Sequence, residues 1–347
     1  MKFSEIGKKI ENTTGKSDVL FADIENEAFR VLGVWKDEEM GIYRRMPDGI
    51  AASVSEPVRG LVKQTAGGRI RFTTNSPYIA IKVKYDDYYR SSHGSLTGKC
   101  GIDVYEGKHY IGVFKPNPLD PTTLESVVEL DGKSHDLTLN MPHYIRVREV
   151  LIGLAEGSEI SHAPLYKYDK PVVFYGSSIT QGACAARPGM TYENILSREI
   201  DFNYINLGFS GNAKAEPEMA EYIAGLDMSA FVYDYEHNTP SLEHLWESHE
   251  RLFLTVREKH PDIPIIIISA PRYYYEAERS GAVKHTYLSA LARGDKNVYF
   301  IPGYSFFTDN AVSEYSVDTT HPTVLGFYFM AKKIAPVLKK CLEDSSK

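Results

Sequence analysis

Residues 171–180 read PVVFYGSSIT, and this stretch decides the fold of the second half of the chain. Its first five residues form a short apolar run rich in Val and aromatic side chains, which is typical of a strand buried on both faces. Gly176 permits a tight turn, and the serines that follow can cap a helix. A strand, a tight turn and a helix in this order predict the first βα unit of a parallel sheet.

Strands and helices continue to alternate after this unit. Further strands are predicted at 204–207, 230–233, 265–269 and 298–301, and helices at 191–200, 217–224, 241–260 and 324–342. The long helix starts at a Ser241 cap and carries an apolar side made of Leu242, Leu245, Leu252 and Val256. Its three histidines, His244, His249 and His260, are expected on the surface. The rhythm predicts a flavodoxin-like, three-layer α/β domain.

The first half has a different pattern. Residues 69–72 and 79–85 alternate apolar and polar side chains, as half-buried strands do, with turn residues between them. Residues 101–105 and 110–114 form a predicted hairpin, and further strands follow at 137–141 and 145–150. Many short strands without long helices predict an all-β, jelly-roll-like sandwich. The pattern changes between 156 and 170, so we expect a sandwich domain at 1–165 and the α/β domain at 166–347; the first 25 or so residues fit no clear element.

Composition excludes several classes of function. The chain has 347 residues, of which 43% are hydrophobic and 24% charged, and a formal net charge of −7. It has no Lys/Arg-rich run, so we expect no nucleic-acid partner. The first 15 residues lack the apolar core of a secretory signal, and no apolar stretch could span a bilayer, so we expect a cytoplasmic protein that does not bind membranes. The three cysteines are widely spaced, which disfavours disulfides and zinc. A homo-oligomer is compatible with the sequence.

Tyrosine is abundant. There are 24 tyrosines, with clusters at 88–89 and 273–275. A tyrosine ring can pack against the face of a sugar, but packing within the sandwich and at its rim is the favoured explanation.

Chemistry is expected where strands of the parallel sheet end, because open α/β sheets bind ligands at that edge. Ser178 follows the first strand and lies near a helix N-terminus, which favours a developing anion. Residues 208–212 (GFSGN) follow the second strand and can offer backbone N–H groups to an oxyanion. Residues 234–238 (DYEHN) follow the third and bring an amide; their carboxylates and histidine leave a metal or acid–base site as the less favoured alternative.

A histidine with a carboxylate partner lies near the C-terminus. Residues 318–323 read DTTHPT, just before the last predicted helix. Asp318 can accept a hydrogen bond from one imidazole nitrogen of His321, which leaves the other nitrogen to take a proton from a serine. Together these segments supply a nucleophile, a base, its orienting acid and oxyanion donors. Acyl transfer needs this set, and it needs no metal or organic cofactor.

The order of these segments resembles the GDSL/SGNH hydrolase superfamily. The matching blocks are Gly176–Thr180, Gly208–Asn212, the segment ending at Asn238, and Asp318–His321. Ser177 stands where the family usually has aspartate, and Tyr-Glu-His-Asn replaces Gly-x-Asn-Asp. Upstream, Gly101–Tyr105 (GIDVY) resembles the Gly-x-Asp-Leu-Tyr signature of a subgroup with an N-terminal β-sandwich.

The resemblance implies a serine esterase. Ser178 would be the nucleophile and His321 the general base oriented by Asp318. The oxyanion would be held by the N–H groups of Ser178 and Gly211 and by the Asn238 amide. Arg187, in a loop that also resembles the subgroup, is expected to line the substrate entrance. Related two-domain enzymes include carbohydrate acetylesterases and a polyketide-tailoring acyltransferase. The expected substrate is therefore an acylated small molecule or oligosaccharide, with an acyltransferase or a non-catalytic sugar-binding module as alternatives.

Overall fold

The computed structural model describes residues 1–347 except 87–91, 121, 272–275, 308–311 and 346–347. Both tyrosine clusters noted in the sequence therefore lie outside the described residues. The chain divides into two compact units. Unit 1 comprises Met1–Arg45, Lys63–Leu165 and Ala186–Gly189, and unit 2 comprises Met46–Val62, Tyr166–Ala185 and Met190–Lys347.

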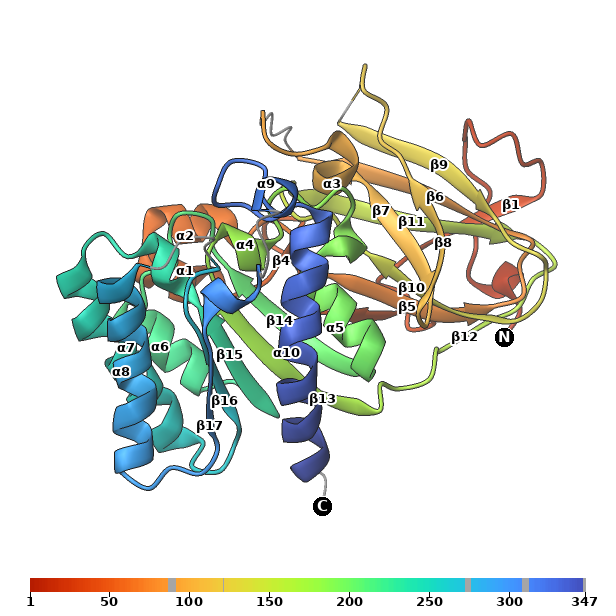
Figure 1. The fold of residues 1–347 in the computed structure, drawn as a ribbon. Helices are drawn as coiled ribbons and strands as arrows, with labels where there is room; N and C mark the ends of the chain where they lie inside the picture. Colours follow the sequence, from red (N-terminus) through yellow and green to blue (C-terminus); the bar gives the residue numbers. More distant parts are fainter. Residues whose placement is uncertain (87–91, 121, 272–275, 308–311, 346–347) are drawn as a thin grey trace. The chain divides into compact units, whose positions relative to one another are not determined.

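Unit 2 is built around a parallel sheet of five strands (Figure 1). In chain order these are β13 (Tyr168–Gly176), β14 (Phe202–Gly208), β15 (Ala230–Asp234), β16 (Ile265–Ile268) and β17 (Val298–Ile301). Their order in the sheet is β14-β13-β15-β16-β17. This is the 2-1-3-4-5 order of flavodoxin-like folds, so the prediction of that fold is confirmed. The order reverses between β13 and β15, and open α/β sheets generally bind ligands beside such a reversal, at the carboxyl ends of the strands.

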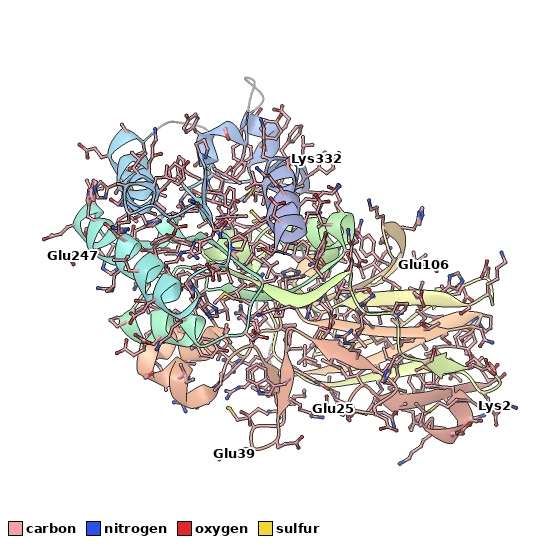
Figure 2. The ribbon with its side chains drawn as sticks, turned by 90° about the horizontal axis from the view of Figure 1, so that it is seen from below. Lys2, Glu25, Glu39, Glu106, Glu247 and Lys332 are labelled. Carbon is pink, nitrogen blue, oxygen red and sulfur yellow. The ribbon has the colours of Figure 1, made fainter. Side chains whose placement is uncertain are left out.

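Helices cover both faces of this sheet. They are α4 (Ser178–Gln181), α5 (Tyr192–Ile200), α6 (Pro217–Ala224), α7 (Leu242–Lys259), α8 (Ala277–Ala292), α9 (Val312–Tyr315) and α10 (Val324–Asp344). Strand residues alternate between the faces: Val172 and Phe174 pack with α5 and α10, whereas Val173 and Tyr175 pack with α6, α7 and α8. Charged side chains such as Glu247 of α7 and Lys332 of α10 point outward (Figure 2). No described helix combines the length and apolarity needed to cross a bilayer.

One prediction about α7 is wrong. His249 is buried, because it lies one turn after Leu245 on the side of the helix that faces the sheet. Its ring packs against Tyr233 and Tyr235, with centroid distances of 4.9 and 5.6 Å. Its Nδ1 lies 2.7 Å from Thr286 Oγ1, and burial lowers the pKa of His249 to about 3. The histidine is thus a neutral core residue.

Unit 1 is an antiparallel β-sandwich. One sheet has the order β1 (Val19–Asp23), β11 (Val147–Ala155), β6 (Tyr78–Tyr85), β9 (Thr123–Glu129). The other has the order β12 (Ile160–Ser161), β5 (Arg69–Thr74), β10 (His135–Asn140), β7 (Ile102–Glu106), β8 (His109–Phe114), with β2 (Arg30–Leu32) paired to β5. Inward side chains of both sheets, such as Ile81, Ile152, Phe72 and Leu139, form one core. The predicted hairpin at 101–114 is present as β7 and β8.

Smaller elements complete unit 1. They are a 3₁₀ turn at Phe3–Glu5, a hairpin of β3 (Trp35–Asp37) and β4 (Ile42–Arg44), and the helix α3 (Leu96–Cys100). The opening residues, which the sequence left unplaced, therefore include a strand of the sandwich.

Two segments do not follow the single boundary expected near residue 165. The helices α1 (Asp48–Val54) and α2 (Glu56–Leu61) come from the middle of the sandwich sequence but belong to unit 2. Four neighbouring side chains are fully buried in the unit 2 core: Met46, Ala51, Val58 and Val62. In the opposite sense, Ala186–Gly189 belongs to unit 1.

Candidate active site

Ser178 stands on a tight turn at the carboxyl end of β13. Ser177 caps the single turn α4 by accepting a hydrogen bond from the Ile179 N–H at 3.2 Å, and Gly182 ends it with a φ of +95°. A side chain at Gly176 would begin 1.8 Å from Asp234 Oδ1 and 2.2 Å from Thr180 Oγ1. Only glycine fits there, because the strand end and the helix turn approach so closely. Ser178 itself is 7% exposed.

The structure brings Ser178, His321 and Asp318 together. The Ser178 hydroxyl donates to His321 Nε2 at 2.8 Å, across 143 residues of sequence. The other ring nitrogen, Nδ1, donates to Asp318 Oδ2 at 2.7 Å. His321 and Asp318 are about one-quarter exposed, so solvent can reach the pair while the serine stays nearly covered. The arrangement has the connectivity of a nucleophile, a base and an orienting carboxylate.

A compact loop fixes the carboxylate and the imidazole. Asp318 Oδ1 accepts the backbone N–H groups of Thr320 at 3.1 Å and His321 at 2.8 Å. Thr319 between them has a φ of +70°, a left-handed conformation that is unusual for a β-branched residue. Partial burial acts to raise the pKa of Asp318, but the hydrogen bonds and the ring of His321 outweigh it and lower that pKa. Asp318 is therefore an anion at neutral pH. Thr323 then caps α10.

The two predicted oxyanion segments are tied to the nucleophile turn and to each other. The Ser210 N–H donates to Gln181 Oε1 of α4 at 2.9 Å, and the Ala213 N–H donates to Asn238 Oδ1 at 3.2 Å. The second bond orients the Asn238 amide, so that its NH₂ group is the side left to donate. Gly211 is exposed, has a φ of +70°, and its N–H makes no hydrogen bond within the described residues. Their roles as oxyanion donors stay predictions.

Sequence reasoning did not identify the structural role of the carboxyl groups near the nucleophile turn. Asp234 ends β15 directly opposite Gly176, and its Oδ1 accepts the Thr180 hydroxyl at 2.5 Å. Glu236 Oε2 accepts the Ala270 N–H at 2.7 Å. These carboxyls, which the sequence offered as a less favoured metal site, thus have structural partners. Among the described residues, no group of three or more His, Cys, Asp or Glu side chains is arranged for a metal. The predicted flavodoxin-like fold places the third strand beside the first, but the register that sets Asp234 opposite Gly176 could not be predicted from the sequence.

Arg187 lies in a polar cluster of unit 1. Its guanidinium pairs with the fully buried Asp103 at 2.9 Å and lies 3.9 Å from the centre of the Tyr110 ring. Asp103 also accepts the Gly189 N–H at 2.8 Å and the Asn140 amide at 2.9 Å. Asp103 is the acidic residue of the GIDVY signature, which thereby acquires a structural role: it holds the segment that follows the nucleophile helix. Substrate binding by Arg187 stays a prediction.

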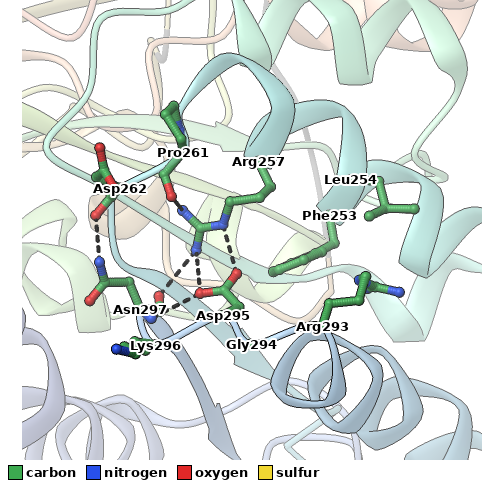
Figure 3. Close-up of a pocket in the computed structure, with 10 residues that line it drawn as sticks. All are labelled: Phe253, Leu254, Arg257, Pro261, Asp262, Arg293, Gly294, Asp295, Lys296 and Asn297. Atoms are coloured by element: carbon green, nitrogen blue, oxygen red, sulfur yellow. Dashed lines mark hydrogen bonds and ion pairs between the residues drawn. The ribbon is translucent and has the colours of Figure 1, made fainter.

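A separate hollow in unit 2 has a volume of about 450 Å³ (Figure 3). It is lined by residues at the end of α7 and in the segments before β16 and β17, at the amino ends of these strands, whereas Ser178 lies beyond a carboxyl end. Arg257 dominates it, donating to Asp295 and to the carbonyls of Pro261, Ile263 and Asn297. These bonds join the loops at the amino ends of β16 and β17, so we interpret the hollow as a structural feature.

Comparisons with known proteins agree with this geometry. A family model described as the GDSL-like lipase/acylhydrolase family matches residues 169–339, and the model of the GxDLY N-terminus of SGNH-hydrolase-type esterases matches residues 19–160. None of the curated proteins matches the chain.

Several solved structures are similar over most of the chain. A candidate GDSL-like lipase from Bacteroides ovatus is 31% identical with a TM-score of 0.83, and the match covers 94% of this chain and 98% of that one. The salicylyl-acyltransferase SsfX3 of a tetracycline biosynthetic pathway is 19% identical, with a TM-score of 0.76 and coverage of 93% and 98%. A family two carbohydrate esterase from Cellvibrio japonicus is 12% identical, with a TM-score of 0.64 and coverage of 95% and 99%. The two family models and the 31% identical relative establish that this chain belongs to the GDSL-like lipase/acylhydrolase family and carries the N-terminal GxDLY domain of SGNH-type esterases.

Proposed function

We propose that this protein is a serine esterase that removes small acyl groups from carbohydrate, with O-acetyl as the preferred group. The observation that carries the proposal is the continuous pair of hydrogen bonds from Ser178 through His321 to Asp318, at 2.8 and 2.7 Å. Family membership supports ester chemistry. The carbohydrate substrate is supported by the likeness of fold to family two carbohydrate esterases and to an acetyl xylan esterase from Butyrivibrio proteoclasticus.

The chemistry follows from the orientation of the three side chains. His321 Nε2 accepts the Ser178 proton as Oγ attacks the ester carbonyl carbon. Asp318, held anionic by its hydrogen bonds, accepts Nδ1–H, which fixes the tautomer and stabilises the imidazolium that forms. His321 then protonates the departing alcohol. In the second half, His321 takes a proton from a water as the water oxygen attacks the acyl-enzyme, and it gives that proton to Ser178 Oγ as the acid is released.

The oxyanion of each tetrahedral intermediate needs donors that are already in place. We assign this role to the N–H groups of Ser178 and Gly211 and to the Asn238 amide. The bond from Ala213 to Asn238 Oδ1 supports the assignment, because it orients the amide before substrate arrives.

The proposal is tested by replacing the nucleophile. Ser178→Ala should lower kcat for p-nitrophenyl acetate by several orders of magnitude, because the covalent route is lost. It should also abolish labelling by a fluorophosphonate probe. Ser177→Ala is the matched control: it removes the neighbouring hydroxyl and a helix cap, at about 1 kcal/mol of stability, but keeps the nucleophile and the label. Normal turnover by Ser178→Ala would end the proposal. A wild-type protein without label on Ser178 would favour a non-catalytic sugar-binding module.

An acyltransferase is the second candidate. The observation that favours it is the TM-score of 0.76 to a salicylyl-acyltransferase that covers nearly the whole chain. Both reactions share the acyl-enzyme and differ only in the acceptor. Product analysis with p-nitrophenyl acetate and an added sugar separates them: free acetate identifies the hydrolase, and acetylated sugar identifies the transferase.

A further inference from the structure

A layer of buried polar side chains lies directly beneath the nucleophile. Thr180, two residues after Ser178, is fully buried and is held at two points. Its hydroxyl donates to Asp234 Oδ1 at 2.5 Å, and its carbonyl accepts the Asn206 amide at 2.6 Å. Asp234 comes from β15 and Asn206 from β14, the two strands that flank β13. The one-turn helix that carries Ser178 is therefore fastened to both neighbouring strands through Thr180.

Two carboxyl groups in this layer have no cation to balance them. Asp234 and Glu193 are 1% and 0% exposed, and neither forms an ion pair within the described residues. One oxygen of each, Asp234 Oδ2 and Glu193 Oε2, is buried without a hydrogen-bond partner. An ionised carboxylate that is buried without a cation is costly, so burial favours the neutral acid at both positions.

The electrostatics agree with the geometry. Burial raises the pKa of Asp234 to about 7, although hydrogen bonds from the Thr180 and Tyr192 side chains and from the Ser177 backbone act in the opposite direction. Burial raises the pKa of Glu193 well above its usual range, and the nearby Asp234 raises it further. The titratable groups that face Asp234 are Glu193 and Tyr192 of α5 and Glu236 in the 3₁₀ turn after β15. None is a cation.

We propose that Asp234 is a positioning residue for Ser178 that works as a neutral carboxylic acid. Its carbonyl oxygen holds Thr180 and thereby the nucleophile turn. In its protonated form the carboxyl carries no negative charge near the developing oxyanion. A buried anion close to the oxyanion would raise the energy of the transition state. The inference rests on the proposed esterase function.

The test compares an isosteric neutral variant with a truncated one. Asp234→Asn keeps an oxygen for Thr180 and carries no charge at any pH. It should retain kcat for p-nitrophenyl acetate within about 3-fold at pH 6, whereas Asp234→Ala should lose about 10-fold or more with little change in KM, because one buried hydrogen bond is lost. Above pH 7 the wild type should decline relative to Asp234→Asn as Asp234 ionises.

Two further pairs keep the test decisive if Asp234→Ala fails to fold. Thr180→Val removes the hydroxyl that donates to Asp234 and should lower kcat. Thr180→Ser keeps a hydroxyl at this position and should retain kcat near the wild-type value. Asp262 is exposed and lies before β16, at the amino ends of the strands. As a control, Asp262→Asn should leave the pH profile of kcat unchanged.

Stability gives a readout that does not depend on turnover. A carboxyl whose pKa is raised by folding contributes stability that is complete below its unfolded value near 4 and is lost as the pH rises through about 7. The melting temperature of the wild type relative to Asp234→Asn should therefore fall across this window.

The outcomes separate the two claims. If the wild type is active, two results would overturn the inference alone. In the first, kcat of Asp234→Asn is as low as that of Asp234→Ala at every pH. In the second, the pH profile of kcat is the same for Asp234→Asn and the wild type. A wild type that neither hydrolyses the ester nor takes the fluorophosphonate label would overturn the proposed function, and the positioning role with it.

Discussion

At the residue scale, the loop around Thr319 orients the imidazole of His321 through hydrogen bonds to the Asp318 carboxylate. Three hydrogen bonds converge on the Asp318 carboxylate from within three residues, and the left-handed Thr319 makes that tight path feasible. Because the backbone N–H of His321 shares the carboxylate with its own ring, the ring is oriented relative to the chain that carries it. Loss of the carboxylate charge should therefore weaken this orientation and leave the imidazole in place.

This arrangement predicts unequal effects of two substitutions. Asp318→Asn should lower kcat by about 10²–10⁴, because the ring is less well oriented and its charged form less stabilised. His321→Ala should lower it further, to roughly the level of Ser178→Ala, because the proton acceptor itself is gone. Steady-state kinetics with p-nitrophenyl acetate, with melting curves to verify folding, make the comparison. Equal losses in the two variants would contradict the division of roles.

A second prediction concerns the glycine at the strand end. Gly176→Ala should destabilise the protein by about 1–3 kcal/mol and lower kcat, because its methyl group would displace Asp234 and Thr180. Gly60→Ala is the matched control. That glycine lies within the helix α2 with no atom near its missing side chain, so alanine should add roughly 0.5–1 kcal/mol. Urea unfolding of both variants measures the difference, and a neutral Gly176→Ala would refute the close approach.

At the scale of elements, the sequence predicted what periodicity and apolar runs can encode. The strands of unit 2 appear within a few residues of their expected bounds, and α6 spans Pro217–Ala224 as expected. The helix α8 has no prediction, because its buried positions are small or polar: Ala282, Val283, Thr286 and Ala290. The helices α1 and α2 have seven and six residues, too few to display a stripe. Ser178, His321 and Asp318 were recognisable by residue type and order, but the structural role of Asp234 was not, since the register between strands is a tertiary property.

The segment Ala186–Gly189 gives a prediction at this scale. Asp103→Asn should cost roughly 1–3 kcal/mol, because it leaves the partly buried Arg187 guanidinium without its anion. Arg187→Lys should cost less but still measurably, since lysine loses the flat contact with Tyr110. Arg148→Lys, at an exposed pair with Asp86, should change stability by less than about 0.5 kcal/mol. Chemical denaturation compares the three, and faster hydrogen exchange at Gly189 should accompany the first.

At the scale of the whole molecule, the exchange of segments between the units determines how the chain can be divided. A fragment of residues 166–347 contains the entire parallel sheet and the three residues of the proposed catalytic machinery. It lacks residues 46–62, whose buried Met46, Val58 and Val62 each contribute about 1.5–3 kcal/mol to the unit 2 core.

We therefore expect the 166–347 fragment to be poorly folded. It should bind a hydrophobic dye and melt at a lower temperature than the full chain. Joining residues 46–62 to it through a Gly/Ser linker should recover part of the lost stability. A fragment 166–347 that melts as cooperatively as unit 2 of the intact chain would contradict the importance of these helices.

The same exchange bears on how such a gene can change over generations. A crossover near residue 165 between two relatives would pack residues 46–62 of one parent into the unit 2 core of the other, and residues 186–189 of one parent into unit 1 of the other. Viable hybrids between relatives are therefore expected to keep residues 46–62 from the same parent as the hydrolase half and residues 186–189 from the same parent as the sandwich.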